Sequence, residues 1–320
     1  MLYLSGLILS ANTPAIAITV NDYESPISPL QRPSQLDANK VTLGDRLFHE
    51  PRLSGDDSIS CAHCHNLESG GGTDNLPHSF GVNGGEGGVN TPTVYNAAYN
   101  LAQFWDGRAA SLEEQIDGPT HNPVEMASNW KQIIEKLSSD RSYLQSFKKI
   151  YGQQEITAAH IKDAIATFER SLVTINSPFD RFISGDKEAL NEDAKAGYQL
   201  FQSYGCISCH QGSNIGGNMF QKLGVFGDYF KDRGNITNAD RGRFAVTGLA
   251  GDNQKFKVPS LRLVTLTAPY FHDGSVATLT EAIRIMAKYQ LGRKMPDKDI
   301  KLIISFLESL VGELHQPEEQ

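Results

Sequence analysis

Two short stretches of the sequence decide its fold: Cys61-Ala62-His63-Cys64-His65 and Cys206-Ile207-Ser208-Cys209-His210. They contain all four cysteines of the chain, and in each stretch a histidine directly follows the second cysteine. A single C-x-x-C pair could be half of a zinc site or a redox dithiol. Two complete C-x-x-C-H motifs with no cysteine left over favour c-type haem attachment, in which the thiols bond to the haem vinyl groups and the histidine binds the iron.

The motifs therefore predict two covalently attached haem c groups. The first would be held by Cys61, Cys64 and His65, and the second by Cys206, Cys209 and His210. Two glycine-rich segments, at 69–90 and 211–259, are unusually long for loops of a compact domain. A large prosthetic group accounts for them, because it supplies part of the core that the loops would otherwise lack.

The composition excludes several classes of protein. The chain has 320 residues, 39% hydrophobic and 21% charged, which is enough apolar material for a folded core. Its net charge is −8, so no excess of basic residues is present to neutralise a phosphate backbone, and no nucleic-acid partner is expected. Four cysteines in a chain of this length exclude a small disulfide-rich domain. The length predicts about two domains.

The first 17 residues have the character of a signal peptide. An apolar run precedes Ala15-Ile16-Ala17, which has the form of a signal-peptidase site, although the usual basic segment before the run is missing. We expect residues 1–17 to direct export to the periplasm, 18–36 to form an extended leader and 315–320 to form a tail. The alternative for the first segment is a buried N-terminal helix.

Apolar residues at helical spacing predict a mainly α-helical chain with few, short strands. The clearest periods lie at 130–137, 161–172, 191–204, 283–286 and 300–311. We expect two cytochrome-c-like helical domains, at 37–175 and 176–314, each with one covalent haem c and long loops. The run FWDGR at 104–108 is interpreted as the start of a helix with a buried aromatic residue.

Several further stretches resemble bacterial di-haem cytochrome c peroxidases over residues 44–310. Besides the two haem motifs, they are LFHEPR (47–52), NTPTVYNA (90–97), AQFWDGRA (102–109), NPVEM (122–126), GRFAVT (242–247), PSLR (259–262) and LTAPYFHDG (266–274). Together and in this order they are highly specific. The resemblance implies a homodimeric enzyme that reduces hydrogen peroxide to water with electrons from a small c-type cytochrome or a cupredoxin.

The resemblance also implies that the two haems have different roles. The N-terminal haem would be the low-potential peroxidatic centre, and the C-terminal haem would be the high-potential centre that accepts electrons. Met286 matches the distal ligand of the second haem, and His/Met ligation raises a haem potential relative to His/His ligation.

Other matches concern the peroxide pocket and the space between the haems. Glu125 matches the acid/base of the pocket, and a carboxylate above an open haem face can shuttle the proton that peroxide cleavage requires. Trp105 matches an aromatic residue placed between the haems. The family's interhaem calcium site, built mostly from oxygen ligands, is matched by Asn90, Thr267 and Pro269.

One position departs from the family pattern. Many relatives carry a distal histidine where Val82 stands, directly after Ser79-Phe80-Gly81. Valine cannot bind iron, so we expect the peroxide site to be open at rest. The alternative is that His78, in the same loop, is a distal iron ligand that blocks the site.

Two other functions compete with the peroxidase. One is a related di-haem oxidase that acts on a protein substrate. That enzyme uses a tyrosine as the second haem's distal ligand, so Met286 argues against it. The other is a non-enzymatic di-haem electron carrier, which needs no acid/base residue above a haem.

Overall fold

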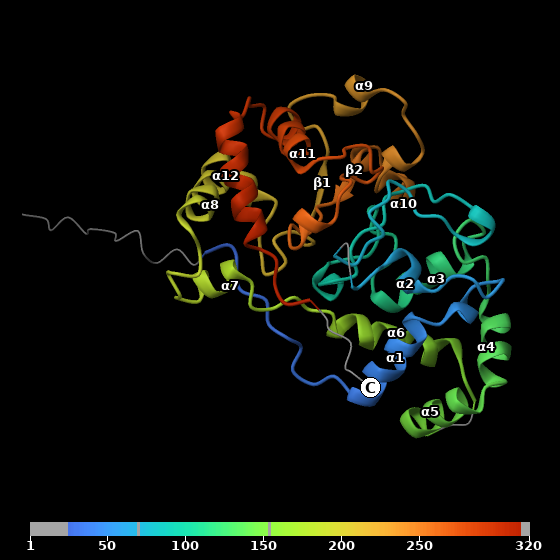
Figure 1. The fold of residues 1–320 in the computed structure, drawn as a ribbon. Helices are drawn as coiled ribbons and strands as arrows, with labels where there is room; N and C mark the ends of the chain where they lie inside the picture. The colour runs from blue at the N-terminus through green and yellow to red at the C-terminus, as the bar shows by residue number, and fades with distance from the viewer. Residues whose placement is uncertain (1–24, 69–70, 153–154, 315–320) are drawn as a thin grey trace, which may run out of the picture.

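The structure, a computed structural model, describes residues 25–68, 71–152 and 155–314. Helices dominate this part of the chain, and its one sheet pairs two short antiparallel strands, β1 (Phe220–Lys222) and β2 (Lys255–Lys257) (Figure 1). The mainly α-helical fold is confirmed. The predicted signal peptide and tail lie outside the described residues, as do residues 18–24 of the leader. No helix in the described ranges is long and apolar enough to cross a membrane.

The helices lie close to the predicted apolar periods. A π-helical turn, η9 (Met286–Gln290), directly continues the helix that the period at 283–286 predicts. The α-helices are α1 (Ala38–Phe48), α2 (Cys61–Cys64), α3 (Leu112–His121), α4 (Trp130–Ser138), α5 (Arg141–Tyr151), α6 (Ala158–Ser171), α7 (Pro178–Ile183), α8 (Glu192–Tyr204), α9 (Tyr229–Arg233), α10 (Phe244–Thr247), α11 (Leu279–Ile285) and α12 (Asp297–Glu308).

The N-terminal half is built around the packing of α1 against α6. Asp37 and Thr157 begin these helices, and each side chain accepts a hydrogen bond from the backbone of the first turn. Where the helices meet, a Cβ on Gly44 would overlap the carbonyl oxygen of Ala164, so only glycine permits this approach. The buried residues around the contact include Leu43, Leu47, Phe48, Ile161, Ile165 and Phe168.

The C-terminal half repeats this arrangement with α8 and α12, which lie side by side in Figure 1. A Cβ on Gly197 would overlap the carbonyl oxygen of Leu302, so glycine again sets the distance between the helices. The surrounding core includes Phe201, Ile303, Phe306 and Leu307. In both halves, the first helix of the pair precedes a C-x-x-C-H motif.

Each end of the described chain packs in the core of the opposite half. Ile27, from the leader segment, is 2% exposed and packs in the C-terminal core. Val311 and Leu314, after α12, pack against the N-terminal core, and Leu263 is buried there as well. The division of the chain at 175/176 therefore stays a prediction, because segments from each side contribute to the other core.

The predicted helix start at 104–108 is wrong. These residues form a loop whose ends are joined by a bridge between Gln103 and Ala109, and α3 begins only at Leu112. Phe104 and Gly107 have φ values of 67° and 68°, which lie in the left-handed region and interrupt a right-handed helix. The side chain of Ser111 caps α3 by accepting from the Glu114 N–H.

Gly44→Ala should lower the free energy of unfolding by about 1–3 kcal/mol, because the added methyl group overpacks the contact between α1 and α6. The measurement is denaturant unfolding of the haem-loaded protein. Gly251→Ala is the matched control, since a Cβ there has nothing within 4 Å. Equal stability of the two variants would contradict the proposed role of Gly44.

Candidate active site: two haem cavities

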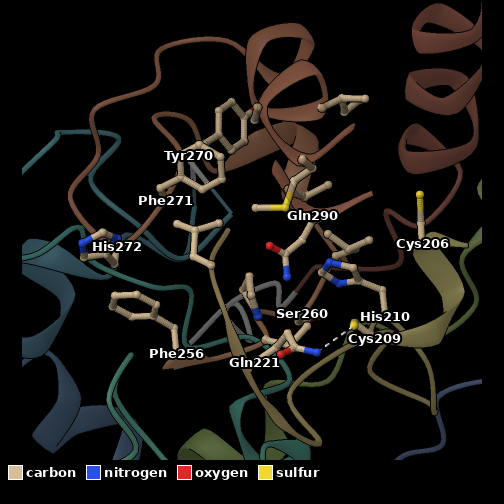
Figure 2. A pocket seen from close by; sticks show the side chains of 18 of the residues that line it. Cys206, Cys209, His210, Gln221, Phe256, Ser260, Tyr270, Phe271, His272 and Gln290 are labelled. Atoms are coloured by element: carbon tan, nitrogen blue, oxygen red, sulfur yellow. Dashed lines mark hydrogen bonds between the residues drawn. The ribbon is translucent and has the colours of Figure 1, made fainter. Parts of the chain in front are cut away.

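Each C-x-x-C-H motif lies on the wall of its own cavity. The smaller cavity, about 160 Å³, is lined by Cys61, Cys64 and His65. The larger, about 600 Å³, is lined by Cys206, Cys209 and His210. Figure 2 shows Cys209 and His210 at one side of the larger cavity, with Phe271 and His272 at the other. The two halves thus provide separate sites.

Each pair of motif cysteines lies in or next to a single helical turn. Cys61 and Cys64 are the ends of helix α2, and Cys206 begins the 3₁₀ turn η5 (Cys206–Ser208). All four thiols are free, and no metal-binding cluster that includes a cysteine occurs among the described residues. Burial raises the pKa of the Cys61 thiol to about 12 and that of Cys206 to about 11. The raised pKa of Cys61 and Cys206 argues against a redox dithiol, and the place of the two cysteine pairs on different cavities argues against one four-cysteine zinc site.

The two motif histidines are suited to bind iron. Burial lowers the pKa of His65, and it lowers the pKa of His210 to about 4, so both imidazoles are neutral at physiological pH. His65 Nδ1 lies 3.3 Å from the carbonyl oxygen of Gly72, which orients the ring and leaves Nε2 for a metal. Two thiols and one neutral imidazole on each cavity wall fit one haem c per cavity.

Glu125 lies on the wall of the smaller cavity, in the loop after α3. Asn122 Nδ2 donates a hydrogen bond of 2.6 Å to Glu125 Oε1. Burial raises the pKa of the Glu125 carboxyl, and both this hydrogen bond and the charge of Arg108 oppose that shift. The structure therefore brings a partly buried, oriented carboxyl group to the cavity of the first haem motif.

The glycine-rich loop after the first motif holds the backbone of Glu125 in place. The Val82 N–H donates to the Glu125 carbonyl oxygen at 2.8 Å. A Cβ on Gly81 would overlap the carbonyl oxygens of Val124 and Glu125, so the two segments pack backbone against backbone. Gly81 lines the cavity, whereas the Val82 side chain is buried.

His78 has a different place from the other predicted ligands. Its Nδ1 lies 3.0 Å from Glu86 Oε1, and its Nε2 is buried without a hydrogen-bond partner in the described part of the chain. Ser79 and Gly81 line the smaller cavity, but His78 does not. Its role as a distal iron ligand stays a prediction.

Trp105 lies at the boundary between the two halves and lines the larger cavity. Its indole Nε1 donates to the Asn90 carbonyl oxygen at 2.9 Å, and its own carbonyl oxygen accepts from the Lys257 N–H at 2.8 Å. The edge of the ring faces His272 at 6.5 Å between centroids. Asn90 lines both cavities, so the indole is fixed at their common boundary.

Met286 lines the larger cavity at the junction between α11 and the π-helical turn η9. Single π-helical turns occur frequently at functional sites. Gln290, at the end of the turn, accepts from the Gly224 N–H at 2.7 Å and donates to the Lys222 carbonyl oxygen at 2.8 Å. These bonds tie the turn to the loop beside β1, which fixes the position of Met286.

The three predicted calcium ligands also meet at the larger cavity. Asn90, Thr267 and Pro269 all lie on its wall. The Asn90 side-chain amide donates to the carbonyl oxygens of Leu76 and Pro77, at 2.8 and 3.3 Å. The structure thus brings the predicted residues together, and the calcium itself stays a prediction.

Sequence reasoning missed several charged residues of the site. Glu169 on α6 is 5% exposed and lines the smaller cavity, and burial raises the pKa of its carboxyl to about 8. Asp240 accepts from His272 at 2.7 Å and from Arg233 at 2.6 Å. Lys257 lines both cavities. The family-like run at 266–274, which contains His272, was a sequence signal for the Asp240–His272 pair. Glu169 and Lys257 had no such signal, because their burial depends on the fold.

Comparison with known proteins agrees with this geometry. A sequence profile described as di-haem cytochrome c peroxidase matches residues 38–188. The chain is 48% identical to cytochrome c peroxidase Ccp of Escherichia coli, over 90% of this chain and 61% of that protein. It is 44% identical to cytochrome c551 peroxidase of Nitrosomonas europaea, over 98% of this chain and 92% of that protein.

The chain belongs to the di-haem cytochrome c peroxidase family. Membership confirms the predicted enzyme class, a peroxidase, and the two haem groups. Among solved structures, a MauG-like protein associated with microbial copper homeostasis has a TM-score of 0.80 to this peroxidase at 27% identity, covering 91% of this chain and 95% of that one. The fold of the family is therefore shared along nearly the whole chain.

Met286→His should lower the potential of the C-terminal haem in this peroxidase, because imidazole favours ferric iron more than a thioether does. Potentiometric titration of the haem-loaded protein measures the shift. Met295 lines the same cavity, and Met295→Leu should leave the potential unchanged. An unchanged potential in Met286→His would rule out Met286 as the ligand.

Proposed function

We propose that the chain reduces hydrogen peroxide to water in the smaller cavity, with Glu125 as the proton carrier and His65 as the proximal ligand. The observation that carries this proposal is a partly buried carboxyl group with a raised pKa, that of Glu125, on the wall of the same cavity as the first haem motif. A haem bound there would supply the iron that binds peroxide and the electrons that break the O–O bond.

Glu125 has the position and chemistry that this reaction needs. As the O–O bond breaks, a proton must leave one oxygen of peroxide and reach the other. The bond from Asn122 fixes one carboxyl oxygen of Glu125, which limits the directions in which the group can take up and return that proton. Burial raises its pKa, which moves the carboxyl towards the pH range where it can act both as base and as acid.

The larger cavity supports the electron-accepting role. His210 and Met286 would be the two axial ligands of its haem, and their combination favours a high potential. Electrons would pass one at a time from this haem to the peroxidatic haem. Trp105 lies at the boundary between the cavities and is held at both its indole and its backbone, which supports it as the aromatic residue for this transfer.

The partners and location follow from the same proposal. The donor would be a small c-type cytochrome or a cupredoxin, the assembly a homodimer and the compartment the periplasm. A calcium ion would bind beside Asn90, Thr267 and Pro269, which lie together on the wall of the larger cavity. There it would brace the hydrogen bond between the Asn90 carbonyl group and Trp105.

The peroxide site would be open at rest. Val82 cannot bind iron, and its backbone N–H is already bonded to Glu125. His78, the alternative ligand, contacts Glu86 and lies off the wall of the smaller cavity. An open site would let the fully oxidised enzyme bind peroxide without prior reduction of the other haem.

Glu125 and Met286 separate this proposal from its two rivals. A simple electron carrier has no use for a partly buried carboxyl group beside a haem, whereas Glu125 lies on the wall of the cavity that holds the first haem motif. An oxidase with tyrosine as the second distal ligand does not match Met286 on the wall of the larger cavity. Steady-state turnover of peroxide with a small reduced cytochrome tests both rivals directly.

Glu125→Gln should lower peroxidase turnover by about 10²–10⁴-fold while leaving both haems attached, because glutamine keeps the shape but cannot exchange a proton. Steady-state assays and haem quantification are the measurements. Glu135→Gln, on the exposed side of α4, is the control and should keep full activity. Turnover of Glu125→Gln within about threefold of the parent would exclude the proton-carrying role.

The resting state is tested by EPR of the fully oxidised protein, comparing the parent with His78→Ala. An open site gives a high-spin signal from one haem in the parent, and the substitution leaves that signal unchanged. A purely low-spin parent that becomes high-spin on loss of His78 would overturn the open site and make His78 the blocking ligand.

A further inference from the structure

Lys257 is a buried cation on the boundary between the two cavities. It ends strand β2, is 7% exposed as a residue and lines both cavities. In the described part of the chain, its ammonium group makes no hydrogen bond or ion pair. Burial lowers the pKa of the Lys257 amine to about 8, against a weaker opposing effect of Asp106. An unpaired ammonium group inside a protein is costly, so such a group normally has an anionic partner.

The direction of the side chain follows from the strand. Successive side chains of a strand point to opposite faces. Phe256 and Val258 line the larger cavity but not the smaller one. Lys257, which follows Phe256 on the strand, lines the smaller cavity as well as the larger one, which fits a side chain on the opposite face from Phe256. It is also the only residue of 176–314 on the wall of the smaller cavity.

The chemistry of the smaller cavity indicates the partner. The other cation on its wall, Arg108, already pairs with Asp106 at 3.0 Å and stacks on Phe104 at 3.4 Å. The carboxyl groups on the wall, Glu125 and Glu169, both have a raised pKa and make no ion pair with Lys257. A haem held by Cys61 and Cys64 brings two propionate groups on the edge remote from the thioether bonds.

We infer that Lys257 binds a propionate of the N-terminal haem and raises the potential of that haem. A positive charge close to the porphyrin disfavours the ferric state more than the ferrous state, because the ferric centre carries one more positive charge. The backbone N–H of Lys257 is bonded to the Trp105 carbonyl group, so this lysine joins the C-terminal half, the interhaem tryptophan and the peroxidatic haem.

This inference rests on the proposed haem in the smaller cavity but not on peroxide turnover, and its readout is a potential measured without peroxide. In Lys257→Met, the reduction equilibrium of the N-terminal haem should shift at least tenfold towards the ferric form, which is 59 mV for one electron. The C-terminal haem should shift less. Lys257→Arg, which retains the charge, should recover at least half of the shift.

Lys255→Met is the matched control on the same strand. Lys255 pairs with Asp252 at 3.1 Å and lies on the wall of neither cavity, so both potentials should stay at the parent values. If Lys257→Met incorporates haem poorly, Lys257→Gln takes its place, because it removes the charge while keeping a polar side chain. Potentiometric titration of the N-terminal haem in that variant then tests the inference. A less than twofold change in the N-terminal equilibrium, or a larger change at the C-terminal haem, would overturn the inference. The two proposals fail separately: if the Lys257 variants leave both potentials unchanged but Glu125→Gln abolishes turnover, the inference on Lys257 falls and the peroxidase proposal stands.

Discussion

Two histidines, His65 and His210, each lie on the wall of a cavity that the chain does not fill with its own side chains. Packed interiors contain few voids of this size, so the rest of the structure depends on a flat prosthetic group in each place. The α1–α6 and α8–α12 pairs form the rigid part of each half, and glycine at each contact brings the helices close. The long loops then wrap the cavities, with much of their packing supplied by the haem.

The boundary between the halves is a hydrogen-bonded unit rather than a simple apolar contact. Trp105 is bonded through its indole to Asn90 and through its backbone to Lys257, while the Asn90 N–H donates to the His272 carbonyl oxygen at 2.8 Å. His272 is in turn held by Asp240. Such a network fixes the orientation of the indole ring at the boundary between the two cavities.

The two cavities differ in the character of their walls, and this difference supports their separate roles. Around the smaller cavity, the buried Glu169 and the partly buried Glu125 are carboxyl groups with a raised pKa, which suits proton transfer. The larger cavity carries a thioether, Met286, and a wall rich in aromatic residues such as Phe256 and Phe271. A largely apolar cavity with a thioether on its wall fits the proposed role of a haem that accepts and passes on electrons.

The sequence by itself determined the main helices and the family, and it predicted the haem attachment residues, because all of these depend on local spacing and on motifs that short segments carry. It could not determine the loop at 104–108, where positive φ values at Phe104 and Gly107 replace the expected helix start. Nor could it identify Lys257, whose short strand has no distinctive motif. Burial, unpaired charge and a shared position between two cavities arise only when segments far apart in the chain are brought together, so the tertiary structure alone decided which charged groups face the haem sites.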